Sequence, residues 1–223
     1  MKKLINIFFL TFLAGILVSS GYSQNLNWRS AGKQNSNIIY SNFGYDFGVT
    51  AQVGYGRFIQ TIRPLVLTFD YSMPMGHRLT DDFKVRFGTH VEFFEKNGFV
   101  ASGKVLGIFR NHKTSLVRIS NFGGEFSLVT GYFKPTFHAA LELSADGAVV
   151  SYLKHSKLMK GNYPEIQDGW YLNNGAHYFY GIQAGKTIGR SYEANLRLGK
   201  VNARGNESDV LPIYFQLGLT SRF

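Results

Sequence analysis

Apolar and polar side chains alternate residue by residue along most of this chain. In residues 83–93, Phe, Val and Thr fill the odd positions, whereas Lys84, Arg86, His90 and Glu92 share the even ones. A β-strand places successive side chains on opposite faces, so a period of two predicts strands rather than helices. A face that carries Lys, Arg, His and Glu together does not suit lipid. The two faces of these strands must therefore meet different surroundings.

Nine segments show this alternation, some of them less cleanly. They cover residues 43–55, 65–72, 83–93, 99–110, 114–133, 137–145, 176–188, 192–204 and 211–223. Asn97 and Gly98 separate two of them and tolerate the positive φ angles of a two-residue hairpin. A closed barrel made from one bacterial chain has an even number of strands, so nine is one too few or one too many. An extra strand within residues 25–40, or a turn at Gly123 and Gly124, gives ten; one unpaired segment gives eight.

The first 23 residues have the order of a secretory signal. Two lysines precede an apolar run over residues 4–18, and Gly21 and Ser23 fit the small-residue positions of a cleavage site. The run is shorter than the roughly 20 residues that a spanning helix needs, which argues against a retained anchor. We therefore expect a cleaved signal peptide, residues 1–23, followed by a single domain, residues 24–223.

The composition agrees with an exported sheet that faces lipid. The chain has no cysteine, which excludes disulfides and a cysteine-linked lipid anchor. Aromatic residues reach 16% while charged residues stay at 17%, and there are 25 glycines, which fit crowded strands. The formal net charge is +10. Because an exported protein seldom meets nucleic acid, we expect lipid and phosphate-rich lipopolysaccharide as its anionic partners, and no nucleic acid.

The end of the chain carries the most specific pattern. Phe215, Leu217, Leu219 and Phe223 fall on one face, which Ser221 interrupts. Here the chain resembles Gram-negative outer-membrane barrels, which typically end on an alternating strand with a C-terminal aromatic residue. In size it is most similar to small OmpA-like and OmpX-like barrels.

The resemblance implies that the barrel-assembly machinery reads this last strand during biogenesis. It also implies an all-β fold, an antiparallel up-and-down transmembrane β-barrel of eight to ten strands with ten favoured, located in the outer membrane. A soluble exported β-sandwich or lipocalin-like barrel is the alternative, because it would show the same alternation.

If the aromatic faces meet lipid, the charged residues on the opposite faces point into the barrel. Such charges are expected to pair, because a buried unpaired charge is costly. Ten strands leave little more room than side chains fill, so we expect a plugged interior; a narrow passive channel for ions or small solutes is the alternative. The expected interior residues are Asp46, Asp70, Lys84, Arg86, His90, Glu92, Lys104, Glu125, Glu142, Glu193 and Arg197.

The longest segment between strands, residues 155–175, is the candidate surface-binding loop. Counting back from a periplasmic C-terminus places it outside the cell, and its aromatic and charged residues suit a sugar or protein ligand. Trp170 and Tyr171 also suit an aromatic girdle at the membrane edge. The loop residues are His155, Lys157, Tyr163, Glu165, Asp168, Trp170 and Tyr171. Shorter outer loops around residues 76–82 and 111–113 add His77, Arg78, His112 and Lys113, which suit lipopolysaccharide phosphates.

We expect a non-enzymatic envelope protein with a structural or surface-binding role. The six histidines are scattered singly, without a spacing typical of a metal or catalytic site, so neither metal nor cofactor is expected. A hydrolase or acyltransferase with a site at the outer rim is a third hypothesis. It would use His77 with Asp81 and Asp82, or His155 with Asp168.

Overall fold

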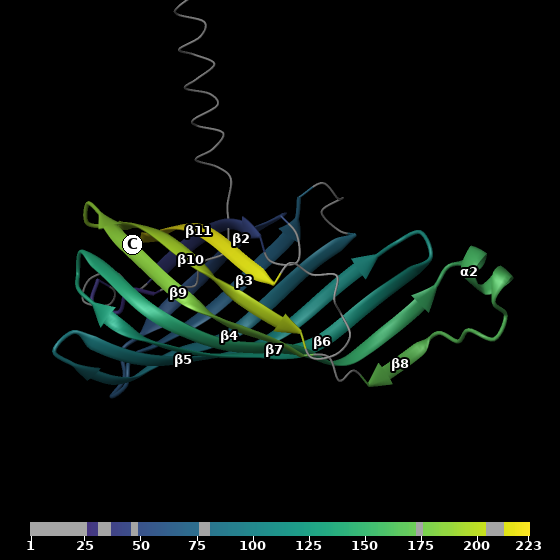
Figure 1. Cartoon of the computed structure of the whole chain (residues 1–223), viewed down its shortest axis with the longest axis horizontal. Helices are drawn as coiled ribbons and strands as arrows, with labels where there is room; N and C mark the ends of the chain where they lie inside the picture. The colour runs from purple at the N-terminus through teal and green to yellow at the C-terminus, as the bar shows by residue number, and fades with distance from the viewer. Residues whose placement is uncertain (1–25, 31–36, 46–48, 76–80, 173–175, 204–211) are drawn as a thin grey trace, which may run out of the picture.

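The chain forms a closed barrel with one protruding side (Figure 1). The structure, a computed structural model, describes residues 26–30, 37–45, 49–75, 81–172, 176–203 and 212–223. Within them the elements are β1 (Asn37–Tyr45), β2 (Val49–Ile59), β3 (Leu65–Pro74), β4 (Asp82–Lys96), β5 (Phe99–Lys113), β6 (Val117–Phe133), β7 (Phe137–His155), α2 (Lys157–Asn162), β8 (Gly169–Leu172), β9 (Ala176–Ile188), β10 (Tyr192–Ala203) and β11 (Ile213–Arg222). No helix in these ranges is long and apolar enough to cross a membrane.

Ten strands make the barrel wall in the described ranges. Each pairs antiparallel with the next along the chain, β7 pairs with β9, and β1 pairs with β11 to close the ring. The short β8 adds only to the outer part of β7. The prediction of an all-β, up-and-down antiparallel barrel with ten strands is confirmed, and the eight-stranded and sandwich alternatives are excluded.

The predicted strand over residues 43–55 is wrong, because two strands occupy this region. β1 and β2 form a hairpin in which Tyr45 lies opposite Val49. The intervening residues 46–48, with the expected interior residue Asp46, lie outside the described residues. Residues opposite each other in a hairpin point to the same face, so the odd positions stay outward on both strands and the alternation continues across the turn. β1, whose end was merged with β2 in the predicted segment, is the tenth strand.

The alternative turn at Gly123 and Gly124 is also wrong. β6 runs without interruption, and β7 continues well beyond its predicted end at residue 145. The register shifts where Phe122 faces Val150 and Gly123 faces Ala148, which leaves Val149 as an extra residue in β7. Such a bulge reverses the order of the two faces, so the alternation in β7 breaks there. By contrast, the Asn97 and Gly98 hairpin is confirmed, with φ angles of 52° and 84°.

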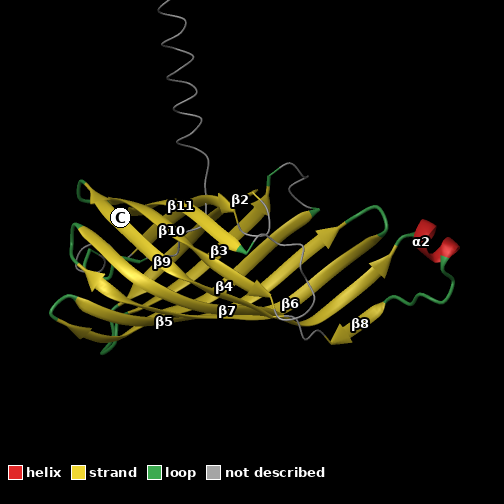
Figure 2. Cartoon of the chain, in the orientation of Figure 1, coloured by secondary structure: helices red, strands yellow, loops and turns green. Residues whose placement is uncertain are grey.

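The two ends of the barrel differ (Figure 2). The turn end carries the tight connections at residues 60–64, 97–98, 134–136 and 189–191, together with the C-terminus. The loop end carries residues 114–116 and 156–168. Here β6 and β7 continue past the barrel wall and, with α2 and β8, form an extension that projects to one side (Figure 1).

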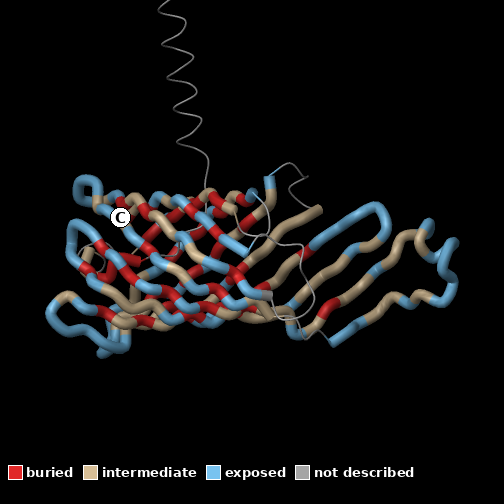
Figure 3. The backbone as a smooth tube through the Cα atoms, in the orientation of Figure 1, coloured by how far each residue is buried: buried red, intermediate tan, exposed pale blue. Residues whose placement is uncertain are grey.

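Buried and exposed residues alternate along the strands (Figure 3). Polar residues such as Gln52, Asp70 and Glu142 are buried in the lumen, whereas Phe87 and Leu143 are about three-fifths exposed on the outer face. A soluble barrel has the opposite arrangement, with apolar side chains inside. The polarity of this barrel is therefore inside out.

Gly123→Ala should destabilise the barrel, whereas Gly124→Ala should not. A Cβ at Gly123 would lie 2.0 Å from the carbonyl oxygen of Gly147, but at Gly124 it would lie 3.5 Å from that of Leu106. We expect the free energy of unfolding in urea to fall by about 1–3 kcal/mol for Gly123→Ala only, because backbone atoms cannot move aside cheaply. Equal stability of the two variants would contradict the close contact between β6 and β7.

Candidate functional site: the lumen and the outer extension

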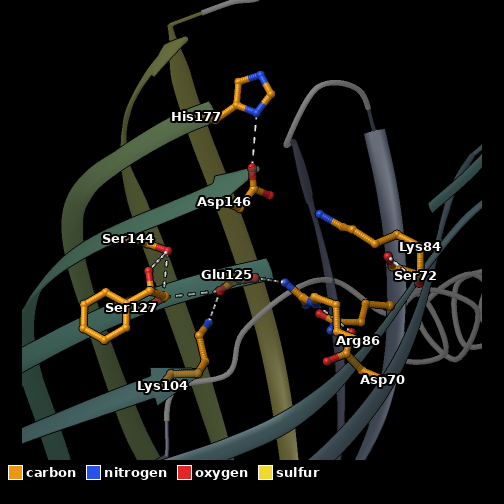
Figure 4. Close-up of polar contacts among 12 residues, drawn as sticks. Asp70, Ser72, Lys84, Arg86, Lys104, Glu125, Ser127, Ser144, Asp146 and His177 are labelled. Carbon is orange, nitrogen blue, oxygen red and sulfur yellow. Dashed lines mark hydrogen bonds and ion pairs between the residues drawn. The ribbon is translucent and has the colours of Figure 1, made fainter. Parts of the chain in front are cut away.

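A four-residue ion-pair network lies in the lumen along four neighbouring strands (Figure 4). Arg86 of β4 donates from Nε to Asp70 of β3 at 2.9 Å and from Nη1 to Glu125 of β6 at 3.0 Å. Lys104 of β5 pairs with the other oxygen of Glu125. All four side chains are at most 8% exposed. Two acids and two bases thus neutralise one another across four neighbouring strands.

Hydroxyl groups add one further hydrogen bond to each carboxylate of this network. Tyr40 donates to Asp70 at 3.2 Å, and Ser127 donates to Glu125 at 3.3 Å. Ser127 also lies 2.7 Å from the hydroxyl of Ser144 (Figure 4). Buried charges are tolerated when they are paired and hydrogen-bonded, so we expect this network to be rigid.

A second ion pair in the lumen joins β7 to β10, which are separated by β9. Arg197 contacts both carboxylate oxygens of Glu142. Gln183 donates to the same carboxylate at 3.0 Å, and Gln216 accepts from Arg197 at 2.9 Å. The guanidinium also lies 4.7 Å from the ring centre of Tyr214, on which it stacks. A fork of this kind fixes the positions of β7 and β10, which are both paired with β9 but not with each other.

The turn end is closed by residues 26–30, which we call the N-terminal plug. Leu26 and Trp28 are buried in an apolar cluster with residues from several strands. The Trp28 ring lies 6.2 Å from that of Phe58, and Asn27 donates to the backbone carbonyl of Lys134 at 2.8 Å. The sequence analysis missed the plug, since so short a segment has no periodicity. The available signal was Trp28, which follows soon after the expected cleavage site.

Polar residues anchor the plug at its other side. Ser30 donates to Glu193 at 3.3 Å, and Arg222 pairs with the same carboxylate at 3.1 Å. His138 lies 3.5 Å from the second oxygen of Glu193. Between the plug and the ion pairs there remains a cavity of about 20 Å³, lined by His90 among others. This volume holds about one water molecule.

The loop end opens into a vestibule of about 330 Å³. Lys84, Arg110 and His112 line it together with His177. Asp146 holds two of these groups, because Arg110 pairs with it and His177 lies 3.1 Å from it. The lumen is therefore wide at one end and filled at the other.

The expected interior residues fall into different places. Asp70, Arg86, Lys104 and Glu125 meet in one network, Glu142 and Arg197 in another, and Glu193 at the plug. Lys84 lines the vestibule, His90 lines the small cavity, and Glu92 is half-buried near the turn end. Asp146 went unnoticed because it follows the predicted end of its strand, although it continues the even-numbered series of Glu142 and Ser144.

Asp168 organises the candidate surface-binding loop. It accepts hydrogen bonds from Lys160 at 2.6 Å and from the backbone N–H of His155 at 2.8 Å, and it lies 3.1 Å from the His155 ring. These contacts, led by that of Lys160, lower the pKa of the Asp168 carboxyl to about 2. Ser156 caps α2 by accepting from the N–H of Met159. Here His155 and Asp168 tie β7 to the segment that leads into β8.

The other loop residues lie around this junction. Lys157, Tyr163 and Glu165 are exposed on or after α2. Trp170 and Tyr171 belong to β8, and the Trp170 ring lies 6.0 Å from Phe122 and 5.1 Å from Tyr152. His77 and Arg78 lie outside the described residues. In the described ranges, no group of three or more His, Asp or Glu side chains is arranged to hold a metal ion.

The closing strand presents its apolar face outward. Phe215, Leu217 and Leu219 of β11 are exposed on the barrel wall. The backbone of Phe223 exchanges hydrogen bonds of 3.0 and 3.1 Å with Asn37 at the start of β1. The C-terminal residue thus lies on the seam that closes the barrel.

Glu125→Gln should destabilise the barrel strongly, because it leaves Arg86 and Lys104 without their shared carboxylate. We expect the free energy of unfolding in urea to fall by about 3–5 kcal/mol, as for other broken buried pairs. Glu165→Gln on the exposed loop also removes one negative charge and should leave the free energy of unfolding unchanged. Equal effects of the two substitutions would mean that net charge, rather than the network, sets the stability.

The junction at Asp168 should loosen in acid. Because its folded pKa is depressed, its contribution is complete above the ordinary value of 3.8 and is lost as pH falls through about 2. Amide-exchange protection of residues 159–163, corrected for intrinsic rates, should therefore drop between about pH 4 and pH 2. Asp168→Asn should show low protection across this range. A wild-type profile without a drop would refute this role.

Comparison with known proteins gives remote structural likenesses. No family model matches the sequence, and no curated protein matches it. A KdgM porin solved in complex with disordered oligogalacturonate is 8% identical, with a TM-score of 0.42 over 83% of this chain and 99% of the porin. The β domain of the Bordetella autotransporter BrkA is 12% identical, with a TM-score of 0.36 over 84% of this chain and 98% of that domain. Both are outer-membrane β-barrels.

Proposed function

We propose that this protein is a closed, non-enzymatic barrel of a Gram-negative outer membrane, and that its outer extension is a binding surface. The observation that supports membrane residence is the outward apolar face of a closed strand ring. Val53, Phe69, Val105 and Ile182 are about half exposed on different strands of this wall. An apolar surface that surrounds a protein is not stable in water, but it matches the hydrocarbon layer.

The two ends give the orientation. Outer-membrane barrels have short periplasmic turns and longer extracellular loops. The tight connections of the turn end, such as residues 97–98, then face the periplasm. The extension and residues 156–168 face the outside. A chain exported through a cleaved signal would reach this location, and the plug would lie directly after that signal.

The filling of the lumen supports a closed state. From the periplasm outward, the plug, the Glu142–Arg197 pair and the Arg86 network follow one another. The small cavity between them holds about one water molecule, so there is no room there for a hydrated solute. A structural or surface-binding role does not need an open lumen, so it is compatible with this filling.

The extension supports surface binding. It carries Tyr163 and Tyr171, both about half exposed, on β8 and the segment between α2 and β8. Exposed aromatic residues beside charges suit a sugar or protein ligand. The Asp168 contacts hold this segment against β7, so such a ligand would meet a preformed surface.

A narrow channel gated by the plug is the second candidate. It is favoured by the vestibule, which already opens one end of the lumen to the outside. The plug is a single short segment, and its loss would remove Leu26 and Trp28 from the cavity lining. In this alternative the plug leaves the lumen before ions pass.

Conductance across a planar lipid bilayer separates the two candidates. We compare the refolded mature protein, residues 24–223, with a variant in which residues 26–30 become a Gly-Ser segment of equal length. Heat-modifiable gel mobility confirms that both are folded. We expect both to be silent, because the two ion-pair layers still fill the lumen of the variant. Steady openings of the variant alone would establish the gated channel, and steady openings of the wild type would refute a closed barrel.

A further inference from the structure

Three cations lie side by side on the outer face of the extension. Lys113 of β5 is directly opposite Arg118 of β6, and Arg118 is directly opposite Lys154 of β7. Residues directly opposite each other in an antiparallel sheet point to the same face, with Cβ atoms about 5 Å apart. We call Lys113, Arg118 and Lys154 the cation row.

The cation row faces the same way as the lipid-facing wall. In β5 and β6 the residues of this face continue from Phe109 and Phe122, whose rings lie 4.9 Å apart, to the cation row without a change of register. Tyr152 and Trp170 lie one level closer to the membrane than Lys154. Two residues along a strand span about 6.8 Å. We call Tyr152 and Trp170 the aromatic row. The cation row therefore lies just beyond the aromatic row, at the depth of lipid headgroups.

Only one of the three charges in this row has a carboxylate partner within the described residues. Lys113 pairs with Asp81 at 3.0 Å. Arg118 donates from Nε to the side-chain oxygen of Asn111 at 2.9 Å, a contact that positions the guanidinium without neutralising it. No carboxylate in the described ranges pairs with Arg118 or Lys154. Like charges directly opposite each other destabilise a sheet. An anion between Arg118 and Lys154 would remove this repulsion.

We infer that Arg118 and Lys154 bind the phosphate of a lipid headgroup in the outer leaflet. A guanidinium that presents its free N–H groups, with an ammonium about 5 Å away, suits a phosphate with several acceptor oxygens. The aromatic row below would hold the lipid chains and set the depth of the headgroup. This inference rests on the proposed membrane residence and names a partner for the extension.

Quenching of Trp170 tests the inference, because this residue lies one level below the cation row. Trp28→Phe leaves Trp170 as the single tryptophan. This protein is refolded into phosphatidylcholine bilayers that contain brominated phosphatidic acid or, in parallel, brominated phosphatidylcholine. We expect phosphatidic acid to bind near Trp170 at least fivefold more tightly, and Arg118→Gln with Lys154→Gln to abolish this preference.

Lys96→Gln with Lys134→Gln is the matched control, because it removes two charges at the turn end and should keep the preference. Equal quenching by both lipids in the parent protein, or a preference that survives the Arg118 and Lys154 substitutions, would overturn the inference. Loss of the preference in the control would assign it to overall charge and overturn it as well. A protein with heat-modifiable mobility but no quenching by either lipid would instead overturn the membrane residence on which the inference rests.

Discussion

The hydrogen-bonded seam between β1 and β11 is the contact on which the rest of the structure depends. Its register runs from Ile38 opposite Arg222 to Tyr45 opposite Phe215, and the backbone of Phe223 lengthens it. An open sheet in lipid would leave two rows of peptide groups without partners, and no water could satisfy them. Closure removes both edges at once. It also fixes the strand number, and hence the width of the lumen that side chains must fill.

The contents of the lumen follow from that width. Side chains fill the lumen of a ten-stranded barrel, and in this chain many of them are long charged residues. Glu142 and Arg197 reach each other from β7 and β10, and Arg86 joins Asp70 to Glu125. The Glu142–Arg197 and Arg86–Glu125 contacts join strands that share no backbone hydrogen bonds. The apolar plug then completes a cluster of buried aliphatic and aromatic residues at the turn end.

Alternation in the sequence predicted the fold class, most strands and the inward side of the charged residues, because a strand between lipid and a polar lumen must alternate. The alternation did not locate every turn and strand end, because some of these features leave no mark in the pattern. The β1–β2 turn keeps the same phase on both sides, and the bulge at Val149 reverses the phase within one strand. Pairing partners such as Arg86 with Glu125 depend on barrel curvature, which no local pattern encodes. The plug depends on tertiary contacts alone.

The outer extension has a consequence for association between molecules. β8 pairs with β7 on one side, and in the described residues no strand pairs with its other side. The backbone groups of this edge are open to another extended chain, which can add to the sheet there. β8 has only four residues, so the exposed edge is short. The closed ring of ten strands has no edge of its own, so β8 is a short docking edge to which an extended peptide or a second molecule can add.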